Sequence, residues 1–164
     1  MWFNKTYIIS MKSEVIMRIS SKGRYGLASM ICVAQLGRNG DFVTVISISE
    51  KLGISKIYLE QVFSLLKRSK LVTSIKGSQG GYQLAKSSEK ITAYDILQAV
   101  EISLFEKTER SVSEQAEEIE KSINTLIWDK MDEAISQVLK NTTLRDLVDE
   151  AERNQEDDSF MFYI

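Results

Sequence analysis

The sequence has no histidine and no proline, and Cys32 is its only cysteine among 164 residues. Without histidine, catalytic triads that use it and the usual hydrolytic zinc sites are excluded. A single cysteine also excludes an intrachain disulfide, a cysteine-rich zinc site and an all-cysteine iron–sulfur site. Cys32 lies among apolar neighbours, which favours a buried, inert thiol over a redox sensor. The sequence holds no nucleophile–base pair or cofactor loop, so we expect no enzyme, no metal and no cofactor.

Long apolar runs are missing as well. No stretch approaches the roughly 18 apolar residues that a membrane span needs. Residues 1–17 lack a long apolar core and a cleavage site of the A-x-A kind, which argues against a secretory signal peptide. The absence of proline favours helices joined by short turns. The sequence therefore predicts a helical, cytoplasmic protein.

The charge of the chain is unevenly distributed. Residues 18–86 hold 11 Lys or Arg and 3 Asp or Glu, a net charge of +8, whereas residues 87–164 hold 8 and 19, a net charge of −11. Residues 1–17 add +1, so that the whole chain carries −2. A basic half joined to an acidic half is typical of a nucleic-acid-binding module attached to another element. A solvated surface with a chance asymmetry is the alternative.

Three predicted helices near the start form a helix-turn-helix pattern. Thr44 is a suitable N-cap for the second of them, and Gly53 stands where a left-handed residue closes that helix. Ser55 caps the third, whose apolar residues fall at helical spacing. Helices separated by Gly-Ile-Ser are typical of this DNA-binding motif. The three predicted helices span residues 21–37, 44–52 and 55–69.

A glycine-rich hairpin follows the helix-turn-helix. Three glycines within six residues indicate a hairpin tip with positive φ angles. Thr92 and Asp95 then form a weak capping box for a helix from Ala93 to about Ile102. The fold class is therefore mostly α with a small β-wing, a winged helix. The predicted strands span residues 71–75 and 82–84, and the tip spans residues 76–81.

After a polar loop at 103–113, a long helical pattern runs from Val112 to Lys140. These 29 residues correspond to about 43 Å of helix, which is too long to be buried against a domain of about 70 residues. The apolar spacing alternates between three and four up to Leu126 and resumes at Met131 after a slip. Pairing with the same helix of a second chain fits this stripe, and packing on the winged domain is the alternative. The expected dimer contacts are Ile119, Ile123, Leu126, Ile127, Met131, Ile135 and Val138.

The second helix of a helix-turn-helix enters the major groove of DNA. Because Leu59 and Val62 are expected to face the core, the polar residues between and before them face outward. Gln61 can read adenine and Glu60 can accept a hydrogen bond from cytosine, although a solvated helix face is the alternative. Lys76 at the glycine tip can enter the minor groove, unless the wing is simply a surface hairpin.

The start of the first helix collects hydroxyls, cations and free backbone N–H groups, which together suit a DNA phosphate. An ordinary N-cap at Ser20 competes with this interpretation and is compatible with it. The sequence thus predicts DNA contacts on two helices and the wing. The expected DNA-binding residues are Ser20, Lys22, Arg24, Tyr25, Ser55, Lys56, Tyr58, Glu60, Gln61, Lys76 and Gly77.

Several of these residues carry a resemblance to a known family. Residues 17–26, Met-Arg-Ile-Ser-Ser-Lys-Gly-Arg-Tyr-Gly, resemble the opening signature of the Rrf2 (Rrf-two) family of bacterial winged-helix regulators. The likeness continues through residues 58–61, 80–82 and 91–96, and it covers the chain from 17 to about 150. The resemblance implies a homodimeric repressor whose long helix dimerises while its third helix and wing meet double-stranded DNA.

The sequence departs from part of the family in one respect. Cluster-binding members carry three cysteines in the loop before the long helix, whereas residues 102–115 contain none. The resemblance therefore implies no cluster here. The ending, Met-Phe-Tyr-Ile, resembles the member that represses cysteine metabolism. That likeness implies O-acetylserine thiol-lyase (CysK) as a partner on which Tyr163 and Ile164 dock, with packing of the tail on its own dimer as the alternative.

The leading interpretation is a repressor of cysteine or sulfur genes that binds a palindromic operator as a homodimer. One alternative is a cluster-independent regulator of iron–sulfur or of redox and nitrosative stress genes. Another is a winged-helix module that binds proteins and no DNA. We expect an N-terminal extension (1–16), a winged helix-turn-helix domain (17–102), linker and dimerisation helices (103–150), and an acidic C-terminal tail (151–164).

Overall fold

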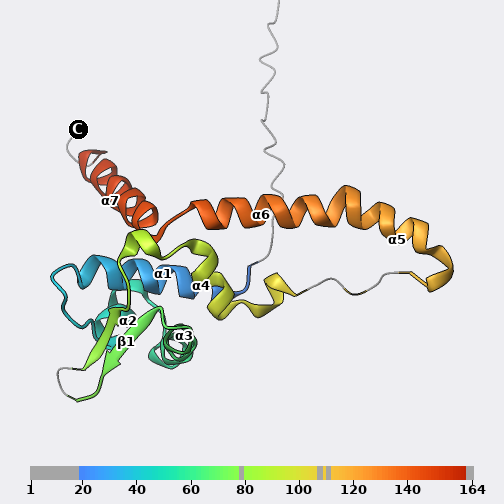
Figure 1. Cartoon of the computed structure of the whole chain (residues 1–164). Coiled ribbons are helices and arrows are strands. Elements are labelled where there is room, and N and C mark those ends of the chain that lie inside the picture. Colours follow the sequence, from blue (N-terminus) through green and yellow to red (C-terminus); the bar gives the residue numbers. More distant parts are fainter. Residues whose placement is uncertain (1–18, 78–79, 107–108, 110–111, 162–164) are drawn as a thin grey trace, which may run out of the picture.

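The computed structural model describes residues 19–77, 80–106, 109 and 112–161. Figure 1 shows a head of short helices with a two-stranded hairpin, from which a long helical segment projects. The head, which we call the winged domain, consists of α1 (Ser21–Leu36), α2 (Val45–Leu52), α3 (Lys56–Arg68), β1 (Val72–Ile75), β2 (Gly81–Leu84), η1 (Ser88–Lys90) and α4 (Ala93–Val100). This architecture confirms the predicted fold class. Within the described ranges, no helix is long and apolar enough to cross a membrane.

Hydroxyl side chains fix the starts of the first three helices. Ser20, Thr44 and Ser55 have extended backbones, and each side chain accepts a hydrogen bond from the backbone N–H three residues later. Each bond satisfies one N–H group that the first helical turn leaves free. Gly53 closes α2 in the left-handed conformation, with a φ of 64°. The predicted caps are confirmed, and together they set the direction in which α3 leaves the turn.

The core lies where α1 crosses α3 and α4. Gly26 permits a close approach of α1 to α4, because a Cβ there would lie 2.8 Å from Cγ2 of Val100. Cys32 is buried in the core, as predicted, and burial raises the pKa of its thiol. The thiolate that oxidation requires is therefore disfavoured. The largest fully buried side chains include Met30, Ile48, Leu59, Phe63, Leu66, Ile91, Ile96, Leu97 and Leu144.

Backbone and ring contacts of β2 attach the wing to the rest of the winged domain. Its two strands pair antiparallel, with Val72 opposite Leu84. Val43, in the loop before α2, exchanges two backbone hydrogen bonds of 2.8 Å with Tyr82. The ring of Tyr82 also stacks on Phe63, with 4.2 Å between the ring centroids. Strand β2 is therefore anchored to both the loop and α3. These contacts fix the orientation of the hairpin relative to α3.

Gly81 makes this attachment possible. A Cβ at Gly81 would lie 2.5 Å from the carbonyl oxygen of Val43, a backbone atom that cannot move without breaking the bridge. We expect Gly81→Ala to lower the free energy of unfolding by about 1–3 kcal/mol, as overpacking does elsewhere. Urea unfolding at neutral pH measures this change. Replacement of glycine by alanine normally stabilises a protein, because alanine reduces the conformational entropy of the unfolded chain. A variant that is as stable as the unchanged protein, or more stable, would therefore contradict the close approach.

Helix α4 starts as predicted and ends earlier. Thr92 and Asp95 form a complete capping box, in which each side chain accepts a hydrogen bond from the other residue's backbone N–H. The helix ends at Val100, two residues before the predicted end, because Glu101 leaves the helical region (φ −123°, ψ 67°). A short 3₁₀ turn, η2 (Ile102–Phe105), follows. The change of direction turns the Glu101 carboxylate back toward α1.

The projecting segment, which we call the stem (residues 117–141), differs from the helix predicted over 112–140. Ala116 (φ −120°, ψ 43°) separates the stem from a preceding 3₁₀ turn, so regular helix begins five residues later than predicted. In the sequence, the spacing of the apolar residues slips between Leu126 and Met131, which are five residues apart. A π-helical turn accounts for this wider spacing, because it holds one residue more than an α-helical turn. The stem is about 38 Å long at 1.5 Å a residue. The stem consists of α5 (Glu117–Ile123), η4 (Asn124–Trp128) and α6 (Asp129–Asn141), and the preceding turn is η3 (Glu114–Ala116).

Among the described residues, the inner end of the stem packs against the winged domain. α6 packs against α4, and the Lys140 ammonium lies 4.8 Å from the centre of the Tyr94 ring. The outer part extends away from the head (Figure 1). The predicted alternative, a helix packed along the winged domain, therefore applies to this inner end alone.

The last helix, α7 (Leu144–Met161), returns to the head and packs on α1. Leu144 is fully buried and donates its N–H to the carbonyl of Ile91 at 2.7 Å. The prediction of a short helix followed by an acidic tail is wrong in its boundary, because α7 continues for 18 residues through the acidic segment. That segment contains neither glycine nor proline, which would end a helix. Tyr163 and Ile164, predicted to dock a partner, lie outside the described residues.

Candidate nucleic-acid interface

The outer face of α3 carries five of the residues predicted to bind DNA. Leu59 and Val62 are buried in the core, as expected, so the polar side chains beside them point to solvent. Lys56 Nζ lies 3.7 Å from Glu60 Oε1, an exposed pair that water and a phosphate can compete with. The helix is therefore free to present these groups to a major groove. The exposed residues are Ser55, Lys56, Tyr58, Glu60 and Gln61.

The N-terminus of α1 lies beside α3. The rings of Tyr25 and Tyr58 meet edge to face, with 6.2 Å between their centroids. The structure thus brings together two groups of residues that the sequence analysis had assigned to separate elements. A cavity lies between the start of α1 and α3. Arg24 is exposed on the same turn of α1 but does not line this cavity. This cavity, of about 370 Å³, is lined by Ser20, Ser21, Lys22, Tyr25, Tyr58, Gln61, Val62 and Glu101.

Glu101 is a buried carboxylate behind the start of α1. Its Oε2 accepts hydrogen bonds from the backbone N–H of Ser20 (3.1 Å) and from the Ser20 hydroxyl, and its Oε1 accepts one from the Ser103 hydroxyl (2.9 Å). These bonds, the Ser20 hydroxyl above all, lower the pKa of Glu101, although burial opposes them. Glu101 therefore holds the cap of α1 in place and joins the end of α4 to the N-terminus of α1.

This carboxylate is expected to stabilise the fold only when it is ionised. Because its pKa is lowered in the folded protein, the stabilisation is present above the ordinary value of 4.5 and is lost as the pH falls through the lowered pKa. We expect Glu101→Gln to reduce the free energy of unfolding at neutral pH by about 1–2 kcal/mol. The difference from the unchanged protein should shrink as the pH is lowered below 4.5. Urea unfolding across this range measures it, and a pH-independent difference would contradict the role of the charge.

A second hollow, lined by lysines, separates the wing from α3. It measures about 490 Å³ and contains Lys56 and Lys67 on the helix side and Lys76 and Gly77 on the wing side. Lys67 Nζ donates a hydrogen bond of 2.6 Å to the Ser74 hydroxyl and so lies across the gap. A DNA backbone that passes between the helix and the wing would meet three cations here. The predicted residues Lys56, Lys76 and Gly77 are therefore close together.

Two residues of this surface were not predicted. Ile57 is 70% exposed in the first turn of α3 and shares a third hollow, of about 460 Å³, with Lys22 and Gln61. An exposed aliphatic side chain at this place can contact a thymine methyl group. The sequence signal was the position of Ile57 off the buried stripe of α3. A rule that assigns every apolar residue to the core overlooks this signal. Lys67, at the far end of α3, reaches the hollow only because the hairpin folds back on it.

Comparison with known proteins shows the family of the chain. The family model for Rrf2, described as an iron-dependent transcriptional regulator, matches residues 19–150. The chain belongs to the Rrf2 family. Among its Rrf2 relatives, CymR of Bacillus subtilis is 39% identical over 151 residues, which cover 90% of this chain and all of CymR. IscR of Erwinia tasmaniensis is 38% identical over 136 residues, which cover 83% of this chain and 81% of IscR.

The solved structures agree. CymR of B. subtilis, described as its global cysteine regulator, has a TM-score of 0.68 at 34% identity, over 82% of this chain and 98% of CymR. These Rrf2 relatives are DNA-binding transcriptional regulators, which confirms the prediction of a regulator rather than an enzyme.

The donor set of this Rrf2 protein does not fit a bound iron–sulfur cluster. The chain contains no histidine, and its single cysteine is buried in α1, far in sequence from the loop that precedes the stem. Among the residues whose structure is described, no three His, Cys, Asp or Glu side chains are grouped to hold an ion. Cysteine and histidine are the ligands that such clusters require. Its regulation is therefore not explained by cluster binding.

Proposed function

We propose that this Rrf2 protein is a cytoplasmic repressor that binds a palindromic operator as a homodimer and controls genes of cysteine or sulfur metabolism. One observation carries the proposal: the outward residues of α3, the N-terminus of α1 and the lysine-lined hollow adjoin one another. All three belong to the half of the chain with a net charge of +8. Such a surface offers phosphate contacts and base-reading side chains together. The predicted DNA-binding residues, with Ile57 and Lys67, form the proposed interface.

The stem supports the proposed homodimer. Leu126 and Val138 are 64% and 65% exposed although both are aliphatic, and they share one stripe with Met131. A second copy of the same stripe would remove these side chains from water. Two recognition helices related by a twofold axis would then meet successive major grooves about 34 Å apart, which requires a palindromic operator. The remaining proposed contacts are Ile119, Ile123, Ile127 and Ile135.

The relatives support a role in cysteine metabolism. CymR is similar to this chain over its whole length, and the structure of CymR is described as that of a global cysteine regulator. IscR is similar to a nearly equal degree, which favours a second candidate function: cluster-independent regulation of iron–sulfur or of redox and nitrosative stress genes. The similarity to CymR extends over all of CymR, whereas that to IscR covers 81% of IscR, and this difference gives the cysteine-related function priority.

Binding of the full-length protein to labelled duplexes tests this function. Fluorescence anisotropy would compare promoters of cysteine-synthesis genes, promoters of iron–sulfur assembly genes and random sequence, at about 50 and 200 mM salt. We expect the cysteine promoters to bind about a thousandfold more tightly than random DNA. Affinity should fall about a hundredfold or more over this salt range. Preference for the iron–sulfur promoters would favour the second candidate, and no binding at either salt concentration would favour a protein-binding module.

We also propose that the chain ending binds O-acetylserine thiol-lyase (CysK). The support is the resemblance of Met-Phe-Tyr-Ile to the ending of a cysteine-metabolism repressor, together with the similarity to CymR. Deletion of Tyr163 and Ile164 is expected to abolish binding to the purified enzyme, as measured by calorimetry, and to leave DNA affinity unchanged. Equal affinity of the truncated and full-length proteins for the enzyme would contradict this docking.

A further inference from the structure

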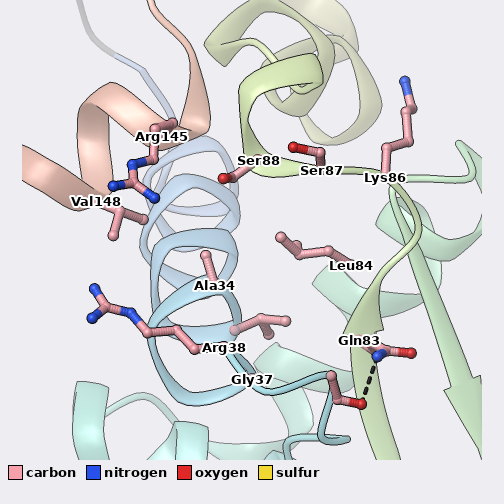
Figure 2. A pocket seen from close by; sticks show the side chains of 12 residues that line it. Ala34, Gly37, Arg38, Gln83, Leu84, Lys86, Ser87, Ser88, Arg145 and Val148 are labelled. Atoms are coloured by element: carbon pink, nitrogen blue, oxygen red, sulfur yellow. Dashed lines mark hydrogen bonds between the residues drawn. The ribbon is translucent and has the colours of Figure 1, made fainter.

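A polar cavity of about 400 Å³ lies between α1, β2, η1 and α7 (Figure 2). None of the residues that line it belongs to the proposed DNA interface. Arg38, Lys86 and Arg145 line it together with the hydroxyls of Ser87 and Ser88, and no carboxylate is among its described lining residues. These cations create a positive potential in a concave site, although Glu152 and Asp149 pair with the two arginines at its outer edge. The cavity is therefore suited to an anion.

The cations occupy two sides of the cavity. Figure 2 shows Arg38 and Arg145 on the side of α1 and α7, and Lys86 on the side of the strand, with Ala34 and Leu84 between them. The apolar side chains in the middle offer no partner to a charged group. A ligand that contacts the cations on both sides therefore carries two acidic groups joined by an apolar segment.

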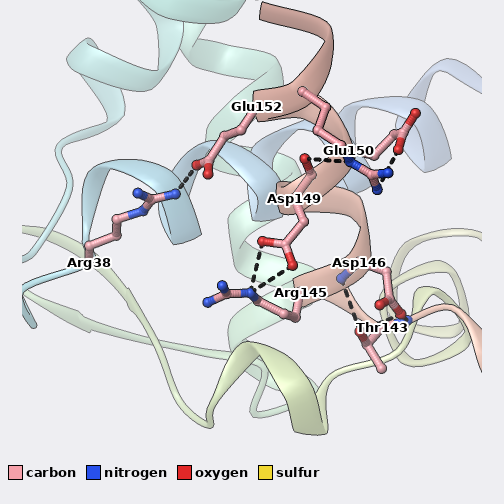
Figure 3. A network of polar contacts seen from close by, with 8 residues as sticks. Arg38, Thr143, Arg145, Asp146, Asp149, Glu150 and Glu152 are labelled. Atoms are coloured by element: carbon pink, nitrogen blue, oxygen red, sulfur yellow. Dashed lines mark hydrogen bonds and ion pairs between the residues drawn. The ribbon is translucent and has the colours of Figure 1, made fainter. Parts of the chain in front are cut away.

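Both arginines already hold carboxylates at their outer edges. Figure 3 shows Arg38 paired with Glu152, and Arg145 paired with Asp149, whose Oδ1 lies 2.9 Å from Arg145 Nε. The guanidinium groups are thus oriented to donate hydrogen bonds to carboxylate oxygens. Exposed ion pairs of this kind contribute little to stability, and a ligand can replace them at small cost. Arginine also offers two parallel N–H donors to carboxylate or phosphate.

We propose that this cavity binds a small organic dianion whose acidic groups are carboxylate or phosphate. Arg38 and Arg145 bind one acidic group, and Lys86 with the hydroxyls of Ser87 and Ser88 binds the other. Ala34 and Leu84 contact the apolar segment between them. Such a ligand is of the size of a central metabolite and uses residues outside the DNA-binding surface.

The site also offers a route to regulation, and this part rests on the proposed function. Lys86 follows β2 of the wing by two residues, and Gln83 in β2 donates a hydrogen bond of 2.6 Å to the carbonyl of Gly40 at the end of the α1 turn. A dianion that links Arg145 on α7 to Lys86 would hold the wing relative to α7. Because coupling between two sites is reciprocal, the ligand and DNA would then change each other's affinity.

Calorimetry of the full-length protein without DNA tests the binding. The probes are succinate, 3-phosphoglycerate and inorganic phosphate, with acetate as a single-charge control, at constant ionic strength. We expect at least one dianionic probe to bind ten times more tightly than acetate, and the Arg38→Gln/Arg145→Gln double variant to lose at least tenfold of that affinity. Succinate and inorganic phosphate distinguish a carboxylate ligand from a phosphate ligand. If no probe binds in an arginine-dependent manner up to about 10 mM, the proposal is wrong.

Two further variants keep the result interpretable. Arg153→Gln removes a similarly exposed ion pair of α7, that with Glu150, outside the cavity, and should bind the probe within twofold of the unchanged protein. Lys86→Gln removes the cation on the opposite side of the cavity and leaves both arginines unchanged. This variant should bind the probe at least fivefold more weakly than the unchanged protein. Equal losses in Arg153→Gln and the double variant would indicate a general effect of charge and overturn the site.

The DNA measurement separates this inference from the proposed function. A saturating probe should change operator affinity at least threefold, and the double variant should abolish that change. Probe binding with unaltered DNA affinity would reject the coupling but retain the anion site. Probe binding by a protein that binds no duplex would contradict the proposed function alone.

Discussion

Chains in which lysine replaces both Leu126 and Met131 are expected to be monomeric and to bind an operator at least a hundredfold more weakly than the unchanged protein. These two side chains flank the step of the π-helical turn and lie on the exposed apolar stripe of the stem. Two ammonium groups on each copy would face two others across the twofold axis, where desolvation and like charge both oppose pairing. A monomer also loses the high effective concentration that a second recognition helix provides.

Sedimentation equilibrium and anisotropy with an operator duplex measure these two effects. Glu133→Lys is the matched control, because it changes the net charge by the same two units at an exposed position off the apolar stripe. The control should remain dimeric and bind DNA at least as tightly as the unchanged protein. A dimeric double variant would show that the stem does not form the interface, whatever its affinity for DNA.

Gln61→Ala is expected to remove discrimination at one base pair of each half-site, at a cost of about 1–3 kcal/mol on the preferred sequence. Gln61 is exposed on α3, and its neighbour Val62 is buried, so its amide has no place in the core. A side-chain amide can donate to and accept from adenine at once, which alanine cannot do. The loss should vanish on an operator already altered at that base pair.

Lys22→Ala should behave differently from Gln61→Ala. Lys22 lies at the start of α1, where a cation meets phosphate and reads no base. Its replacement should weaken binding equally for operator and random DNA and reduce the salt dependence by about one counterion. Anisotropy on operators with single base-pair changes compares the two variants, with the exposed α4 residue replaced in Gln98→Ala as control. Equal losses on operator and random DNA for Gln61→Ala would contradict its reading role.

Short-range features of this fold could be predicted from the sequence. Ser20, Thr44 and Ser55 each act on a backbone group three residues away, so the signal and its effect share one short segment. The outward face of α3 follows from the spacing of its buried residues in the same way. These local rules place most of the candidate interface.

Contacts between distant segments could not be predicted in this way. Glu101 accepts hydrogen bonds from Ser20, 81 residues earlier, and no local pattern contains that pairing. The same contact draws Glu101 out of α4 and shortens the helix. Ile57 was overlooked for a related reason, because hydropathy alone does not distinguish an apolar side chain in the core from one offered to DNA. The course of α7 depends on its packing against α1, which the acidic composition of the segment conceals.

The π-helical turn makes the stem tolerant of a deletion of one residue. It accommodates one residue more than an α-helical turn between Leu126 and Met131. Loss of that residue would leave a four-residue step, and the stripe on both halves of the stem would still face one direction. A deletion of one residue here therefore leaves the direction of the apolar stripe unchanged. In the proposed homodimer, a stem shortened by this residue would still present its pairing face to the second copy.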